Sequence, residues 1–154
     1  MWTAIEQAVS EATGKDFKII DRSAVAGGCI NDAQRLEGEQ EVYFTKTNDA
    51  SFLDLFEAEA EALRELDATG AIRVPRPICH GLCGDGLAFL TLEFIETGAG
   101  GPRSQQALGE SLAKMHGTRR DFFGWTRDNA IGSTHQANAP CDDWPTFFRE
   151  SRLR

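Results

Sequence analysis

The fold is decided by a strand-like stretch and the helix-like run that follows it, Val42-Tyr43-Phe44-Thr45-Lys46 and Phe56-Glu57-Ala58-Glu59-Ala60-Glu61-Ala62-Leu63. Alternation along a strand places Lys46 on the same face as Val42 and Phe44, and we expect that face to be buried. Glu59 shares the inner face of its helix with an apolar residue three positions before it and another four positions after it. A carboxylate that points into a protein needs a cation, and Lys46 lies on the sheet that this helix covers. The two stretches therefore predict a helix packed on a sheet, with a Lys46–Glu59 ion pair between them.

Outward from this stretch, the pattern predicts a series of short strands and helices. The strands are expected at residues 17–26, 32–36, 42–46, 78–82 and 87–95. The helices are expected at residues 3–14, 51–69 and 104–116, with a last one that starts at Asp143 and is still running at Arg154. Residues 122–142 are expected to be irregular, and the Gly-rich segment 97–101 is the best candidate boundary. This order indicates an α+β fold in which a five-stranded antiparallel sheet, with one helix packed on it, precedes a helical part.

The composition of the 154 residues is that of an ordinary globular chain, with 41% hydrophobic and 26% charged residues. The length suits one domain, or one and a fraction. With 16 Lys and Arg against 24 Asp and Glu, the net charge of −8 argues against nucleic acid or an anionic membrane as the main partner. No apolar run is long enough for a spanning helix, and the first residues lack the pattern of a signal peptide. We therefore expect a cytoplasmic protein with reduced cysteines.

The loop between the first two expected strands is glycine-rich and reads Ala26-Gly27-Gly28-Cys29-Ile30-Asn31-Asp32. Its glycines can bring backbone N–H groups close to an anion without interference from a Cβ atom. An ordinary tight turn is the alternative, and the loop is not the P-loop of the NTPases because no Gly-Lys-Ser/Thr follows it. A strand lysine paired with a helix glutamate beneath such a loop is the arrangement with which protein kinases hold the phosphates of ATP.

The last expected strand leads through Leu92-Glu93-Phe94-Ile95-Glu96 into the Gly-rich segment. In kinase-like folds a hinge at this place supplies backbone groups to adenine, here the carbonyl of Glu93 and the N–H of Ile95. An ordinary edge strand is the alternative. The nucleotide-binding residues that these features predict are Gly27, Gly28, Cys29, Ile30, Asn31, Lys46, Glu59, Glu93, Phe94 and Ile95.

Several longer runs of the sequence carry a resemblance as well. The runs are Gly27-Gly28-Cys29-Ile30-Asn31, Tyr43-Phe44-Thr45-Lys46, Val74-Pro75-Arg76-Pro77-Ile78, Leu92-Glu93-Phe94-Ile95-Glu96, Leu108 to His116, Phe123-Gly124-Trp125, Asn129 to Asn138 and Asp142 to Leu153. They are similar to the fructosamine kinase (ketosamine 3-kinase) family, and the block from Gly124 to Asn138 separates it from the related aminoglycoside and choline phosphotransferases. The resemblance implies that the γ-phosphate of ATP, held with Mg²⁺, is transferred to a sugar hydroxyl of a ketosamine. This substrate is a glycated amine or protein, and the reaction is a step of deglycation.

The resemblance also implies a division of the chain. Residues 1–96 would form a protein-kinase-like N-terminal lobe that binds the nucleotide, residues 97–103 a hinge linker, and residues 104–154 the start of a helical C-terminal lobe. The family's catalytic loop, a His-Gly-Asp run that holds the catalytic base, and its metal-binding Asp-Pro-Ala type run do not occur in these 154 residues. We therefore expect a chain truncated inside a helix, with no catalytic residue of its own and no phosphate transfer, and with the catalytic Asp and the Mg²⁺ ligands beyond Arg154.

Two further groups of side chains carry predictions. Similar members of the family have a cysteine at the position of Cys29, in some of them as a redox switch that links two chains. Cys29 is therefore the expected site of an intermolecular disulfide, with a small residue fitted to a tight turn as the alternative. Cys79 and Cys83 are expected in the core rather than on a metal ion. The candidates for the acceptor side of the cleft, with simple loop packing as the alternative, are Trp125, Asn129, Gln136 and Asn138.

A non-catalytic role is the competing prediction. In a truncated lobe the apolar faces of residues 108–115 and 144–148 lack partners, and such faces tend to associate or to swap. The chain would then be a half-kinase module that acts through a homodimer or a domain swap. A small-molecule phosphotransferase of the aminoglycoside or choline type is the other alternative.

Overall fold

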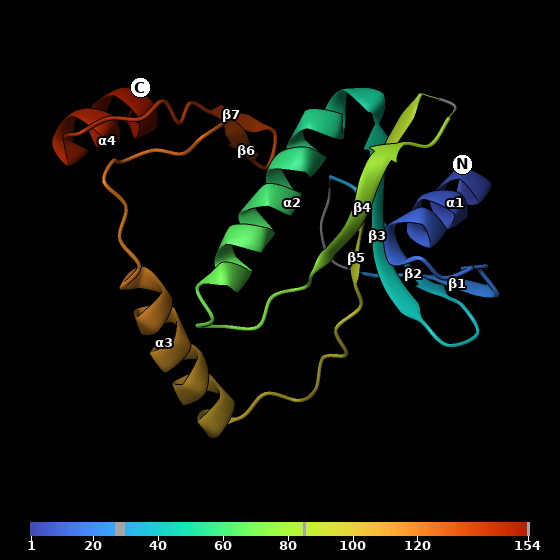
Figure 1. The fold of residues 1–154 in the computed structure, drawn as a ribbon. Coiled ribbons are helices and arrows are strands. Elements are labelled where there is room, and N and C mark those ends of the chain that lie inside the picture. The colour runs from blue at the N-terminus through green and yellow to red at the C-terminus, as the bar shows by residue number, and fades with distance from the viewer. Residues whose placement is uncertain (27–29, 85, 154) are drawn as a thin grey trace.

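The computed structural model describes residues 1–26, 30–84 and 86–153, and it has the α+β fold that the sequence predicts (Figure 1). Its main sheet has five antiparallel strands in the order β1-β2-β3-β5-β4. The strands are β1 (Asp21–Ala24), β2 (Asp32–Glu37), β3 (Val42–Asp49), β4 (Pro77–Leu82) and β5 (Leu87–Glu93). The helices are α1 (Trp2–Thr13), the 3₁₀ turn η1 (Ala50–Phe52), α2 (Leu53–Ala68), α3 (Pro102–His116) and α4 (Trp144–Arg152). No helix in the described residues is both long and apolar enough to span a membrane.

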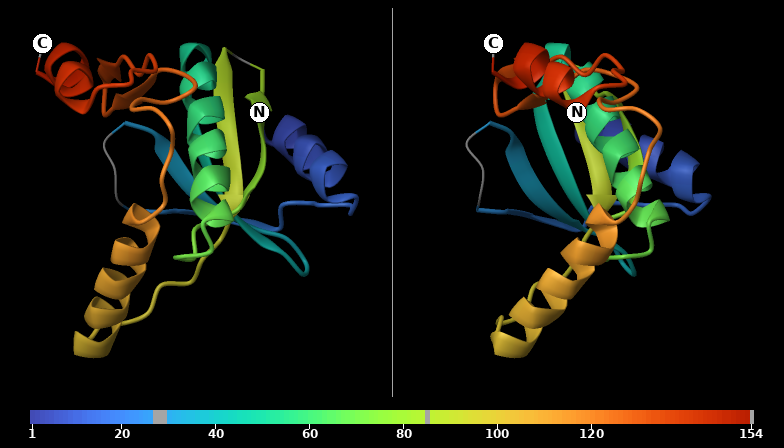
Figure 2. Two further views of the ribbon diagram at one scale, coloured as in Figure 1. Left: turned by 60° about the vertical axis from the view of Figure 1, so that its left-hand side comes forward. Right: turned by 90° about the vertical axis from the view of Figure 1, so that its left-hand side faces the viewer.

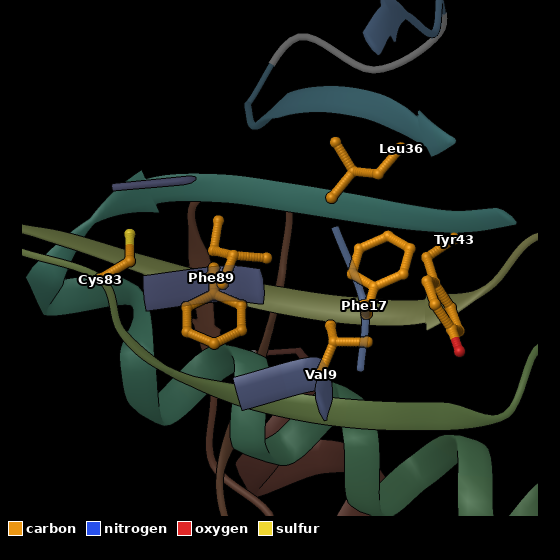
Figure 3. Close-up of a cluster of buried hydrophobic side chains, with 7 residues drawn as sticks. Val9, Phe17, Leu36, Tyr43, Cys83 and Phe89 are labelled. Carbon is orange, nitrogen blue, oxygen red and sulfur yellow. The ribbon is translucent and has the colours of Figure 1, made fainter. Parts of the chain in front are cut away.

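A helix covers each face of the sheet, with α1 on one side and α2 on the other (Figures 1 and 2). On the α1 side, Figure 3 shows Val9 close to strand and loop residues of the same buried cluster. Within that cluster the rings of Phe17 and Tyr43 meet edge to face at 5.0 Å. On the α2 side, apolar residues of the helix pack against Ala88, Leu90 and Leu92 of β5. The sequence predicted one helix packed on the sheet. The structure has a second, α1, which buries Val9 against the face opposite α2.

The strand β3 corrects the prediction of which face is buried. Tyr43, Thr45 and Thr47, on the α1 side, are 8%, 1% and 6% exposed. The opposite face, which carries Phe44 and Lys46, is only half-buried, because α2 packs mainly on β4 and β5. Threonines do not mark a buried face in a hydrophobicity pattern, so alternation placed Lys46 correctly on the α2 side but did not show that the other face of the strand is the more deeply buried one.

Strand boundaries differ from the prediction mainly at the start of the sheet. The strand expected from residue 17 begins only at Asp21, because the N–H of Ile19 bonds at 2.9 Å to the Glu6 carboxylate on α1 and Phe17 enters the core. The predicted β4–β5 hairpin is confirmed by the bond of 3.0 Å from the N–H of Leu87 to the carbonyl of Gly84. Asp85, in the middle of that turn, lies outside the described residues.

The later part of the chain holds a hairpin that the sequence did not predict. Strands β6 (Asn129–Ile131) and β7 (Thr134–Gln136) pair within the segment that was expected to be irregular. Strands of three residues are too short to show alternation, which explains the omission. The hairpin lies beside α2, whereas α3 projects away from the sheet (Figure 2). The last helix ends at Arg152, so it does not run on as predicted, and Arg154 lies outside the described residues.

Candidate nucleotide-binding site

The site is built around Lys46, which lies in β3 opposite Ala33 of β2 and Leu90 of β5. Its side chain is 23% exposed, and that of Glu59 on α2 is 34% exposed. The two form the predicted ion pair, with 2.5 Å between Lys46 Nζ and Glu59 Oε1. Water screens a charge-assisted bond less in this half-buried setting than on an open surface. The pair therefore holds the ammonium group of Lys46 in a fixed direction at the edge of the apolar layer beneath α2.

The glycine-rich loop approaches this pair through its second half. Gly27, Gly28 and Cys29 lie outside the described residues, so the predictions that name them stay predictions. Ile30 and Asn31 are both held by Asn48, whose Nδ2 donates to the Ile30 carbonyl and to Asn31 Oδ1 at 2.8 Å each. Asn48 lies two residues after Lys46 in β3 and so shares its face. The end of the loop is thereby tied to the sheet face that carries Lys46.

A cavity of about 360 Å³ lies between this part of the loop, α2 and the β6–β7 hairpin. Glu59 lines it together with apolar side chains of α2 and with Asn129 of the hairpin. A larger and more open cavity, of about 730 Å³, lies along the first residues of β3 and includes Glu93 and Phe94, but neither Lys46 nor Glu59. The smaller cavity is the one that adjoins the candidate phosphate-binding pair.

The residues predicted for a hinge follow β5. The N–H of Glu93 bonds to the Arg76 carbonyl at 2.8 Å, and its carboxylate pairs with Arg73 at 2.8 Å and with Arg76 at 3.5 Å. The hydrogen bond from Arg73 lowers the pKa of Glu93, against a smaller opposing effect of burial. Arg35 of β2 stacks over the ring of Phe94 at 5.3 Å, and Ile95 is half-buried. These contacts fix the backbone just before the Gly-rich segment, and the adenine-binding role stays a prediction.

The residues predicted for the acceptor side make mostly internal contacts. Asn138 is 3% exposed, and its Nδ2 donates to the Arg127 carbonyl and to Asn129 Oδ1 at 3.1 and 3.0 Å. Trp125 Nε1 donates to Glu65 at 3.0 Å. Gln136 is the ladder partner of Asn129. These contacts favour the alternative of loop packing, although Asn129 also lines the smaller cavity.

Sequence reasoning missed a set of contacts between α2 and the segment before the hairpin. Three glutamates of α2 pair with residues of segment 120–127, more than fifty positions later in the chain. The available signal was the spacing of Glu57, Glu61 and Glu65, which repeats every four residues and marks one side of the helix. No pattern in the sequence identified the cations that meet this side.

The cysteines and the acidic groups of the described residues show no metal centre. Among them, no three His, Cys, Asp or Glu side chains lie close enough to hold a metal ion. Cys83 is 1% exposed and belongs to the α1-side core, which confirms the core prediction for it, and Cys79 is partly buried and packs against this core. Burial raises the pKa of the Cys79 thiol to about 11, although a hydrogen bond with Thr91 acts the other way.

The whole chain, residues 1–154, matches the sequence model that describes fructosamine kinases. It belongs to the fructosamine kinase family. A protein named probable ketoamine kinase from Synechocystis sp. is 44% identical over 153 residues, and the chloroplastic protein-ribulosamine 3-kinase of rice is 40% identical over 142 residues. The two matches cover 99% and 91% of this chain, but 52% and 41% of the relatives. The chain thus spans about half the length of the curated relatives it matches.

Solved structures share the fold of this chain. A candidate fructosamine-3-kinase from Haemophilus somnus superposes with a TM-score of 0.92 at 29% identity, over 99% of this chain and 52% of that one. A second, from Thermobifida fusca, superposes with a TM-score of 0.78 at 28% identity, over 96% of this chain and 50% of that one. An aminoglycoside phosphotransferase, APH(4)-Ia, has a TM-score of 0.53 at 15% identity over 97% of this chain and 49% of that one, a likeness of fold alone. The predicted family and the predicted fold class are therefore confirmed.

Proposed function

We propose that this chain is the ATP-binding part of a fructosamine (ketosamine) kinase. The observation that carries the proposal is the Lys46–Glu59 ion pair, 2.5 Å long, which joins the sheet to α2 beside the end of the glycine-rich loop. Protein kinases hold ATP phosphates with a strand lysine and a helix glutamate in this arrangement. The match of residues 1–154 to the fructosamine kinase family supports the same reading.

Each part of the site has a role in this proposal. Lys46 is half-buried and keeps two N–H donors besides the one that meets Glu59, so it suits an anionic phosphate group. Glu59 fixes the direction of the ammonium group. Backbone N–H groups of residues 27–31 would bind the phosphates, and the backbone of residues 93–95 would bind adenine. Mg²⁺, when bound, would neutralise charge on the phosphates, and we place its ligands outside the described residues.

The second substrate would be a ketosamine, a sugar joined to a free or protein-bound amine, and its sugar hydroxyl would receive the phosphate as a step of deglycation. The family and the names of the Synechocystis and rice relatives support this class of substrate. These 154 residues contain no His-Gly-Asp run for a catalytic base. We therefore propose that the chain alone binds nucleotide but does not transfer phosphate. We also propose that it works in the cytoplasm.

Calorimetric titration of the 154-residue chain with Mg-ATP tests the nucleotide-binding proposal. We expect saturable binding that weakens by about tenfold or more in Lys46→Ala, because the variant loses a charge-assisted hydrogen bond and leaves Glu59 unpaired near the phosphates. The matched control is Lys18→Ala, since Lys18 is an exposed cation on the α1 side, 3.7 Å from Glu6. Equal affinities for wild type and Lys46→Ala would contradict the proposal.

The second candidate function is a non-catalytic module that self-associates, and the exposed apolar side chains of α3 and α4 favour it. They are Leu108, Leu112, Trp144 and Phe148. A disulfide through Cys29 would make such a homodimer covalent, and non-reducing gels of oxidised wild type and Cys29→Ser would test this. Covalent dimer in the variant would contradict a disulfide at Cys29. The aminoglycoside or choline alternative has no comparable support, because its structural likeness is one of fold.

A further inference from the structure

One side of α2 carries a row of three glutamates that is separate from Glu59. Glu57, Glu61 and Glu65 follow at intervals of four residues, so they lie one above another along the helix. Glu59 is two positions away from the nearest members of the row, which is about 200° around the helix axis. The helix therefore presents Glu59 toward Lys46 and the acidic row on nearly the opposite side.

Arg127 meets two members of this row at once. Its Nη2 lies 3.4 Å from Glu57 Oε2 and its Nη1 lies 3.5 Å from Glu61 Oε2. Nη2 also donates to the Asp54 carbonyl at 3.2 Å, a group in the first turn of the helix. The Arg127 side chain is 30% exposed, so these interactions are screened less than those of an open surface pair. One planar guanidinium thus fixes a length of α2 that spans two turns.

The far end of the row is held by two other residues of segment 120–127. Arg120 Nη2 lies 2.6 Å from Glu65 Oε2, and Trp125 Nε1 donates to Glu65 Oε1 at 3.0 Å. Partial burial alone would raise the pKa of Glu65, but these two hydrogen bonds and the charge of Arg120 together lower it. The carboxylate is therefore held in its charged form, as an acceptor for both donors.

The segment that supplies these donors is itself held in place by Asn138. The Asn138 side chain donates to the Arg127 carbonyl at 3.1 Å, and its backbone N–H donates to Asp128 at 2.8 Å. The N–H of Trp125 bonds to the Asn138 carbonyl at 2.8 Å. The positions of Arg127 and Trp125 are therefore fixed by backbone contacts and not only by their side chains.

Few apolar residues of α2 are fully buried against the sheet. Of the residues of α2, all of which the structure describes, the buried ones are Phe56, Ala58 and Ala60. Leu53 and Leu63 of the helix are partly buried and pack against the same cluster. The polar contacts of the acidic row add a restraint on the position of α2 from the side away from Glu59.

We propose that Arg127 is a positioning residue for nucleotide binding, because it holds α2 so that Glu59 stays beside Lys46. The inference rests on the proposed function, in which the Lys46–Glu59 pair receives the phosphates. Kinases depend on the placement of the helix that carries this glutamate. Here the placement is set by a segment that follows α3 in the chain.

The experiment is a double-mutant cycle on the 154-residue chain, read as the affinity for Mg-ATP. We expect Arg127→Gln to weaken binding about fivefold, Arg127→Lys to recover part of the loss, and Arg64→Gln to have no effect. Arg64 is the matched control because it is an exposed arginine on the same helix. In a Glu59→Gln background, Arg127→Gln should weaken binding no further, because its effect passes through Glu59. A purely structural role would leave the effect of Arg127→Gln unchanged in that background.

The outcomes separate this inference from the proposed function. Equal binding by wild type and Lys46→Ala would overturn the proposed function, and the inference with it. Two results would overturn the inference alone. One is weak binding by Lys46→Ala together with wild-type affinity in Arg127→Gln. The other is an equal effect of Arg127→Gln on affinity with and without Glu59. Circular dichroism checks folding. If Arg127→Gln does not fold, the cycle is run with Glu57→Gln combined with Glu61→Gln, which removes the two carboxylates that Arg127 contacts on the helix.

Discussion

At the scale of single residues, Cys79 shows how burial changes reactivity. Burial raises the pKa of its thiol to about 11, so very little reactive thiolate exists at pH 8. We expect iodoacetamide at pH 8 to modify Cys79 in the folded chain at least about tenfold more slowly than in urea, where the thiol has an ordinary pKa near 8.5. Mass spectrometry of the peptide that contains Cys79 measures both rates.

The pH dependence separates a raised pKa from simple steric protection of Cys79. In the folded chain the rate should keep rising from pH 8 to pH 10, because the thiol is still losing its proton there. In urea the rate should level off above pH 9, where most of the thiol is already ionised. A flat profile for the folded chain over this range would contradict the raised pKa and leave steric protection as the cause.

The residues differ in how far the sequence could predict them. Lys46 and Glu59 could be paired from sequence, because strand alternation and helix periodicity each fix a direction and a buried carboxylate needs a cation. Asn138, 3% exposed with its donors and acceptor engaged, could not be recognised as a structural centre. Its partners lie 9 to 14 positions away in segments without regular spacing, so no periodic signal connects them.

At the scale of elements, Gly124 fixes the turn that delivers Trp125 to α2. Its φ of +113° is a conformation that other residues rarely adopt. A Cβ atom there would lie 2.6 Å from the Asn138 carbonyl oxygen and 2.9 Å from that of Ala139. We expect Gly124→Ala to lower the free energy of unfolding by about 1–3 kcal/mol from backbone strain alone. Urea denaturation followed by circular dichroism measures the change.

Gly109→Ala is the control for that prediction. Gly109 lies inside α3, and a Cβ atom there would meet nothing within 4 Å. Alanine favours a helix over glycine, so this variant should be as stable as wild type or more stable by up to about 1 kcal/mol. If Gly124→Ala unfolded at the same urea concentration as Gly109→Ala, the close approach of the backbone at Gly124 would be contradicted.

Elements were predictable where a repeating pattern was long enough. The amphipathic period of α2 and the turn between β4 and β5 gave their positions within a few residues. The period of α1 identified a helix but not the face of the sheet that it covers, because periodicity shows which side of a helix is apolar and not what that side meets. For the same reason the period did not show what the acidic side of α2 meets, which includes Arg127, 66 and 70 positions later in the chain.

At the scale of the whole molecule, the net charge of −8 is not spread over a uniformly solvated surface. Four glutamates of α2 are engaged in ion pairs, one with Lys46 and the others with Arg120 and Arg127. Four of the 24 acidic residues therefore make contacts that join α2 to the sheet and to the segment after α3. The sign of the total charge excluded some partners, but it did not show this internal use of the acidic residues.

The last prediction concerns the apolar side of α3, where Leu108 and Leu112 are 49% and 36% exposed. We expect the 154-residue chain to self-associate through this side, and Leu108→Ser combined with Leu112→Ser to lower the average mass measured by light scattering. Leu82→Ser, at an exposed leucine on β4, should leave that mass unchanged. Added salt should increase the mass, because it screens the repulsion between chains of net charge −8. A monomer at every concentration, or a mass that falls with salt, would contradict apolar association.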